Sequence, residues 1–108
     1  MIDNKYIKNK LQTLALKYQD TKDEKTSILF NKELHNYLLK KTIHKITDNL
    51  DFNDKKWCIN ETITDIFLNI DKLNLEKYHI TQIIVRTYRQ HIYKYFKSRK
   101  RYIFMEFL

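Results

Sequence analysis

The cations and aromatic rings of residues 77–102 are the residues in this sequence whose types and spacing could bind a ligand. When this segment is drawn as a helix with about 100° per residue, its charged and aromatic side chains gather on one side. The members of this set are Arg86, Arg89, Tyr93, Phe96, Lys97 and Lys100. Cations neutralise phosphates and release counterions, and exposed rings stack on unpaired bases. The pattern therefore predicts a nucleic-acid surface suited to opened strands.

The distribution of charge supports this interpretation more than the net charge of +8 does. Residues 1–76 contain thirteen Lys or Arg and twelve Asp or Glu, whereas residues 77–105 contain eight Lys or Arg and no acid. A one-sided block of this kind is typical of surfaces that bind polyanions. Two alternatives stay open: an ordinary solvated lysine-rich face, and packing of Tyr93 and Phe96 under the C-terminal tail.

Other site chemistries lack the residues they need. The chain contains no Gly, so it has no Gly-rich phosphate loop, and its carboxylates form no recognisable acid–base pair. Cys58 and the four histidines lack the spacing of zinc ligands. These histidines are His35, His44, His79 and His91. We therefore expect no catalytic residue, no metal, no cofactor and no enzymatic activity, with His91 a core residue.

The lone cysteine and the hydropathy pattern bear on location. Cys58 cannot form an internal disulfide, which suits a reducing compartment. No stretch approaches 18 apolar residues, and no signal-peptide pattern opens the chain. We expect a cytoplasmic protein without a membrane partner.

An all-α fold must position these side chains. Sheets usually need Gly or Pro in their turns, and this chain has neither. Apolar residues at helical spacing predict helices over residues 4–19, 26–49, about 54–70 and about 77–102. Asn53 or Asp54 is predicted to cap the third helix. We expect a compact bundle of about four helices with a long basic C-terminal helix. The domain would cover residues 1–103, followed by a hydrophobic–acidic tail at 104–108.

Each predicted helix has an apolar stripe that should form the core. In the first two helices the stripe residues are Tyr6, Ile7, Leu11, Leu14, Tyr18, Phe30, Leu34, Tyr37, Leu38, Ile43 and Ile46. In the last two they are Ile59, Ile63, Ile66, Phe67, Ile70, Ile80, Ile83, Ile84, Thr87, Tyr88, His91 and Tyr95. Leu50, Phe52, Leu73 and Leu75 are expected to anchor the loops.

The order of two segments resembles region 2 of bacterial sigma factors. A helix with the pattern WxxNETIxDIFLNIDKL (57–73) precedes a long basic helix, IIVRTYRQHIYKYFKSRKR (83–101). In that family the first helix docks on the clamp-helix coiled coil of the RNA polymerase β′ subunit. The second carries aromatic and basic residues that melt and hold the −10 promoter element. The resemblance implies core RNA polymerase and promoter DNA as partners.

Site residues follow from this resemblance by position. The polymerase-facing residues would be Glu61, Asp65, Leu68 and Asn69, which the helical wheel places on the outer side of the third helix. An exposed Leu68 beside acids is itself an interface signal. The alternative is an ordinary solvated face.

Within that family, the sequence resembles the short late-promoter sigma factors of T-even-type phages. Those proteins also begin with a small helix, have a tryptophan where this chain has Trp57, and end in a motif that binds the replication sliding clamp. The tail FMEFL (104–108) is similar to that motif, which implies a clamp-binding role for Phe104, Phe107 and Leu108. The segment that precedes the motif in the phage proteins is mostly missing here. The alternative is a helix end whose rings fold onto the core.

Three functions stay open from the sequence. The first is a sigma-like subunit that binds RNA polymerase and opens an AT-rich −10 element. The second is a small interaction protein that inhibits or redirects a host complex such as RNA polymerase. The third is a protein that binds duplex DNA through charge alone.

Overall fold

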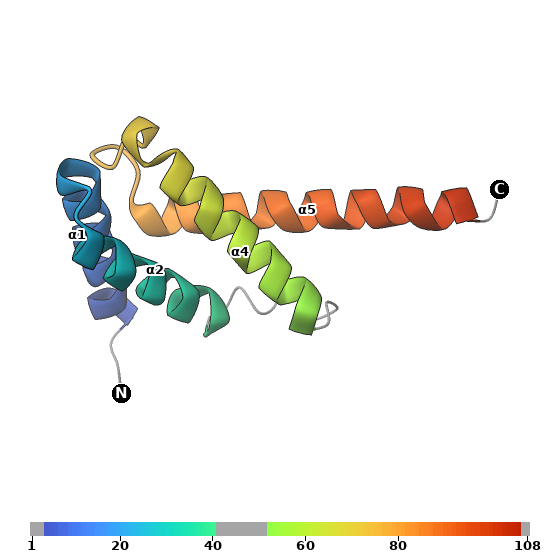
Figure 1. Ribbon diagram of the computed structural model, residues 1–108, viewed down its shortest axis with the longest axis horizontal. Coiled ribbons are helices and arrows are strands. Elements are labelled where there is room, and N and C mark those ends of the chain that lie inside the picture. The colour runs from blue at the N-terminus through green and yellow to red at the C-terminus, as the bar shows by residue number, and fades with distance from the viewer. Residues whose placement is uncertain (1–3, 41–51, 107–108) are drawn as a thin grey trace.

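The computed structural model describes residues 4–40 and 52–106, and gives only the backbone of residues 4, 52, 96 and 98–106. Within these residues the chain forms four α-helices and one short 3-10 helix, with no strand (Figure 1). They are α1 (Asn4–Thr21), α2 (Glu24–Leu39), α4 (Phe52–Leu68), η1 (Ile70–Lys72) and α5 (Ile80–Glu106). The prediction of an all-α bundle of about four helices is confirmed.

The helices pack as two pairs around one core. α1 lies against α2, α4 crosses α5, and α1–α5 and α2–α4 contacts join the pairs. The core takes buried apolar side chains from every helix, including Leu11, Phe30, Ile66, Ile84 and Tyr88. Figure 1 shows the C-terminal part of α5 extending past the other three helices. The helix is 27 residues long, and the molecule measures 52 × 33 × 25 Å.

Aromatic contacts fix how the helices meet. Tyr18, Phe30 and Phe67 bring together α1, α2 and α4, with ring centroids 5.2–6.3 Å apart. Trp57 of α4 lies 6.0 Å from Tyr95 of α5. Ring pairs at these separations stabilise packing beyond the area they bury.

The turn between α1 and α2 shows how a chain without glycine ends a helix. Lys22 has a φ of 54°, in the left-handed region that glycine usually occupies after a helix. This conformation costs about 1–2 kcal/mol for a residue with a Cβ. Its N–H donates to the Tyr18 carbonyl at 2.9 Å, and its ammonium contacts the Gln19 carbonyl and the Asp71 carboxylate. These bonds offset the cost of the backbone.

Two glutamines of α1 hold the connection between α4 and α5. Gln19 donates to the carbonyls of Ile70 and Leu73, each at 2.8 Å. Gln12 donates to the Leu75 carbonyl at 3.0 Å, and its amide oxygen accepts from the Ile80 N–H at 2.8 Å. Because the first N–H groups of a helix lack partners within the helix, Gln12 supplies a cap for α5 from a distant part of the chain.

Several predicted helix ends are wrong. α2 ends at Leu39, because Lys40 leaves helical geometry while its N–H donates to the Asn36 carbonyl. The rest of the predicted second helix, with Ile43 and Ile46, lies outside the described residues, as does Leu50. α4 begins at Phe52, so Asn53 and Asp54 lie inside the helix and do not cap it.

The α4–α5 connection is also longer than predicted. α4 ends at Leu68 rather than near residue 70, and α5 begins at Ile80 rather than near 77. The Asn74 side chain accepts the Lys77 N–H at 3.1 Å, which holds residues 74–77 in a turn before the helix starts. Leu75 is buried and Leu73 is half-buried, so both anchor this connection as predicted.

The predicted core is confirmed at most described positions. The main exception is Tyr6, whose side chain is 63% exposed because it lies about 140° around the helix from Leu11. Ala15 and Ile92 are buried core residues that the wheel left out. His91 is buried as predicted. Among the described helices, none is long and apolar enough to cross a membrane.

Candidate nucleic-acid interface

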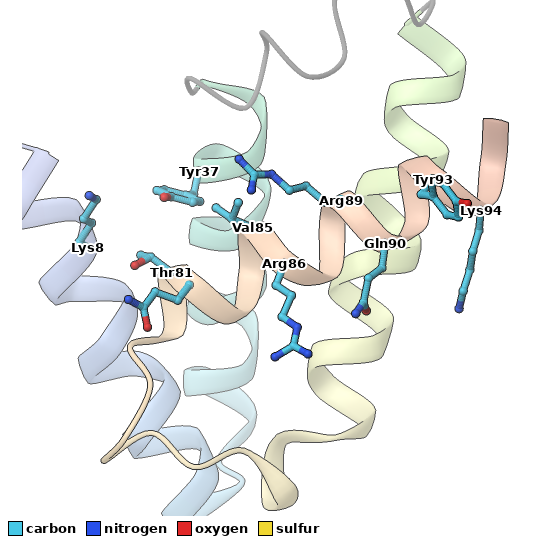
Figure 2. A pocket seen from close by; sticks show the side chains of 10 residues that line it. Lys8, Tyr37, Thr81, Val85, Arg86, Arg89, Gln90, Tyr93 and Lys94 are labelled. Carbon is cyan, nitrogen blue, oxygen red and sulfur yellow. The ribbon is translucent and has the colours of Figure 1, made fainter. Parts of the chain in front are cut away.

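An open groove of about 970 Å³ lies between α5 and the α1–α2 pair (Figure 2). We call it the α5 groove. Most of its lining comes from α5 in four successive pairs of neighbouring residues, joined by one residue each from α1 and α2. The α5 pairs are at 81–82, 85–86, 89–90 and 93–94, and the other two residues are Lys8 and Tyr37.

The spacing of the α5 pairs explains why they share a face. Residues four apart lie above one another on a helix, so a pair repeated every four residues makes a continuous stripe. Ile80, Ile84 and Tyr88, which precede successive pairs, point into the core and hold this stripe outward. Burial of one side of α5 therefore fixes what the other side presents.

The electrostatics of the α5 groove are one-sided. Its lining contains four cations, Lys8, Arg86, Arg89 and Lys94, and no carboxylate. All four are exposed, and none forms an ion pair with another residue that the structure describes. Clefts lined by one sign of charge concentrate the field and attract the opposite charge. The groove is suited to a polyanion.

Two tyrosines give the α5 groove its rings. Tyr93 is 68% exposed, so most of its side chain is open to solvent. Tyr37 is buried, and this burial raises the pKa of its phenol. Because the hydroxyl keeps its proton at neutral pH, it adds no negative charge beside the cations. In Figure 2 the Arg89 side chain reaches toward Tyr37, whereas Arg86 and Lys94 point to another side of the groove.

The structure brings together part of the predicted nucleic-acid face. Arg86, Arg89 and Tyr93 all line the α5 groove. Lys97 is exposed one turn beyond Tyr93. The side chains of Phe96, Lys100 and Phe104 lie outside the described residues, as do Phe107 and Leu108 entirely. The backbone of residues 104–106 continues α5.

Sequence reasoning missed the other groove residues for two reasons. Gln82, Gln90 and Lys94 belong to the four-residue repeat of α5 and could have been found from that spacing. Lys8 and Tyr37 belong to other helices, and no local pattern places them beside α5. Tyr37 was assigned to the core, where most of its ring does lie.

The predicted outer side of α4 is partly wrong. Leu68 is 76% exposed and Asn69 is exposed, but Glu61 and Asp65 are half-buried. The Asp65 carboxylate contacts Nε2 of the buried His91 on α5. Asp65 therefore lies at the α4–α5 contact, which the wheel of α4 alone does not show.

The exposed stripe of α4 runs through Trp57, Asn60, Thr64 and Leu68 instead. Beside it, a groove of about 370 Å³ separates α4 from α2, and we call it the α2–α4 groove. Its lining is apolar or uncharged and includes the exposed Ile28 and Leu68, the half-buried Phe67 and the buried Ile63. Ile28 is 61% exposed. Exposed apolar side chains from two helices around one groove are a feature of protein-binding surfaces.

The described residues form no cluster that could bind a metal ion, and Cys58 is not a reactive thiol. In the described part of the chain, no three His, Cys, Asp or Glu residues lie where they could hold one metal ion. Cys58 is fully buried, and burial together with Asp54 and Glu61 raises the pKa of its thiol to about 11. A thiol in this state is a poor nucleophile at neutral pH.

Comparisons with models of known protein families, with curated proteins and with solved structures found no significant match to this chain.

Proposed function

We propose that the protein binds an opened nucleic-acid strand in the α5 groove, and that it does so as a sigma-like subunit of RNA polymerase at an AT-rich −10-type promoter element. The observation that carries the proposal is the acid-free lining of four cations beside the exposed ring of Tyr93. In this proposal α5 is the long basic C-terminal helix that holds the strand.

The side chains of the α5 groove favour binding of a single strand over binding of an intact duplex. Lys8, Arg86, Arg89 and Lys94 would neutralise phosphates, which makes binding salt-dependent. Tyr93 offers a ring on which an unpaired base can stack, and such stacking contributes about 1–3 kcal/mol per base. A base inside a duplex has both faces covered, so this contribution is available only where the strands have separated.

The polymerase-binding part of the proposal rests on the resemblance and on the surface of α4. We assign the docking surface to Trp57, Asn60, Thr64 and Leu68, because these exposed side chains follow one another at helical spacing on one face of that helix. Asn69 adjoins them. Glu61 and Asp65 would lie at the border of the surface rather than in its centre.

The test of strand binding compares a promoter fragment containing a bubble with the matched intact duplex. Tyr93→Ala should weaken bubble binding about fivefold or more and leave duplex binding unchanged. Tyr78→Ala is the matched control, because Tyr78 is exposed on the α4–α5 connection and lies outside the α5 groove. Equal weakening on both probes would show that Tyr93 does not stack on bases.

The test of polymerase binding is a pull-down with core RNA polymerase, followed by a promoter-opening assay. Leu68→Lys should abolish retention while leaving bubble binding intact. Leu16→Lys, at an exposed position on α1, is the control. No retention of the unaltered protein at low salt would refute the sigma-like part of the proposal.

One observation favours a second candidate function, a small interaction protein that inhibits or redirects a host complex. The exposed apolar side chains of Ile28 and Leu68 line an uncharged groove that shares no residue with the α5 groove. Such a protein would bind polymerase or another partner without opening promoters. Run-off transcription from an AT-rich late-type promoter separates the two candidates, because only a sigma-like subunit gives a transcript with core polymerase.

A further inference from the structure

A second groove continues the basic surface beyond α5. It lies between α1 and α2, has a volume of about 210 Å³, and we call it the α1–α2 groove. Tyr37 lines both this groove and the α5 groove, so the two meet at its ring. Its other polar and aromatic lining residues are Tyr6, Lys10, Glu33, Asn36 and Lys40.

The charge of the combined surface remains strongly positive. The two grooves together are lined by six cations and one carboxylate. That carboxylate, Glu33, is paired with Lys10 at 3.2 Å, so it leaves the charge of Lys8 and Lys40 uncompensated. A phosphate chain that leaves the α5 groove past Tyr37 therefore meets further cations rather than a repulsive edge.

The exposed ring of Tyr6 fits this arrangement. It lies outside the buried stripe of α1 that contains Leu11 and Ala15, and its side chain is 63% exposed at the α1–α2 groove. Tyr93 is exposed in the α5 groove, so each groove offers one open ring, with Tyr37 between them. Alternating cations and open rings are the pattern of proteins that track a single strand.

We propose that the strand bound in the α5 groove continues past Tyr37 into the α1–α2 groove, where Lys40 contacts a phosphate and Tyr6 stacks on an unpaired base. This inference rests on the proposed strand-binding function and adds the path of the strand. The path follows the lining pairs of α5 as far as Tyr37 and then leaves α5 toward α1 and α2.

The experiment measures binding of fluorescent oligothymidylates by anisotropy, over lengths of about four to sixteen nucleotides. The double variant Tyr6→Ala/Lys40→Ala should bind the longest strand about fivefold or more weakly and the shortest strand as the unaltered protein does. For this variant and the long strand, the slope of log K against log salt concentration should become shallower by about 0.7, because one phosphate contact is lost. Arg86→Ala/Arg89→Ala should weaken binding at every length.

The matched control is Tyr78→Ala/Lys17→Ala, which removes an exposed ring and an exposed cation outside both grooves. It should bind every length as the unaltered protein does. All altered side chains are exposed, and circular dichroism confirms that each variant is folded.

The outcomes separate the inference from the proposed function. If Tyr6→Ala/Lys40→Ala binds all lengths normally while Arg86→Ala/Arg89→Ala is weakened, the strand does not enter the α1–α2 groove and the inference is wrong. An effect of the control variant as large as that of Tyr6→Ala/Lys40→Ala would also overturn it. If the unaltered protein binds no oligothymidylate at low salt, the proposed strand-binding function and the inference both fail.

Discussion

Through its contact with His91, Asp65 stabilises helix packing at a position where the sequence predicted an exposed binding surface. His91 lies on the buried side of α5, and its Nε2 would be a buried polar atom without a partner if Asp65 were absent. Leaving such a group without a hydrogen bond costs more than the bond itself contributes. Asp65 therefore helps to hold α4 against α5.

Asp65→Ala should lower the free energy of unfolding by about 1 kcal/mol, because the carboxylate is partly exposed and its bond to His91 is weakened by solvent. Urea denaturation measures the change. Asp20→Ala, at an exposed position on α1, should change the free energy by less than about 0.5 kcal/mol. Similar values for the two variants would mean that the His91 contact adds no stability.

Cys58 should be unreactive in the folded protein. Its thiol pKa is raised from 9.0 to about 11, so at pH 8 its thiolate fraction is about 100-fold below that of an ordinary cysteine. Alkylation by iodoacetamide, followed by mass spectrometry, should be slow in buffer and fast in denaturing urea. Equal rates in the two conditions would contradict burial of the thiol.

The raised pKa of the Cys58 thiol also determines whether the stability of the protein rises or falls with pH. Between about pH 9 and 11 the unfolded chain loses the Cys58 proton while the folded chain keeps it. The contribution of Cys58 to stability is therefore present below pH 9 and is lost as the pH rises through 11.

At the scale of elements, the start of α5 depends on α1. The Gln12 amide accepts the Ile80 N–H and donates to the Leu75 carbonyl, so one side chain satisfies both the helix end and the connection before it. Because the groove-lining pairs begin directly after Ile80, this cap also sets where the α5 groove starts.

Gln12→Ala should lower the free energy of unfolding by about 1–2 kcal/mol, the usual effect of losing a cap. Gln12→Glu should lose less, since it keeps an acceptor for the Ile80 N–H and places a negative charge at a helix N-terminus. Thermal or urea unfolding gives the comparison. Asn9→Ala, an exposed change on the same helix, serves as the control. The loss of unfolding free energy should be smallest for Asn9→Ala, larger for Gln12→Glu and largest for Gln12→Ala.

At the scale of the whole molecule, one core joins all four described helices. Leu11, Phe30, Ile66, Ile84 and Tyr88 come from α1, α2, α4 and α5 and belong to one buried cluster. No pair of helices has a core of its own, so we expect the bundle to unfold as a unit. Far-UV circular dichroism and the fluorescence of Trp57, the one tryptophan, should report the same transition.

Ile84→Ala should reduce the stability of this unit by about 2–5 kcal/mol, because Ile84 is completely buried. Ile28→Ala removes the same atoms from an exposed position and should change stability by less than about 0.5 kcal/mol. The shift of the urea midpoint measures both. Separate midpoints for the two spectroscopic signals would show that the helix pairs unfold independently.

The helical class and most of the core follow from the amino-acid sequence alone. The absence of Gly and Pro and the apolar spacing of residues such as Leu11, Phe30 and Ile84 depend only on local geometry, which a chain carries into any fold. The same is true of the stripe containing Arg86, Arg89 and Tyr93, since its side of α5 follows once the opposite side is buried. The helix ends were less predictable.

Where distant elements meet depends on the three-dimensional packing of the helices. It placed Lys8 and Tyr37 beside α5, turned Asp65 toward His91, and began α5 at Ile80 through the amide of Gln12. Each of these depends on contacts between residues far apart in the chain, which helical periodicity does not contain. The predicted basic face of one helix thereby became a groove made from three helices, because the packing of α1 and α2 against α5 supplies its other walls.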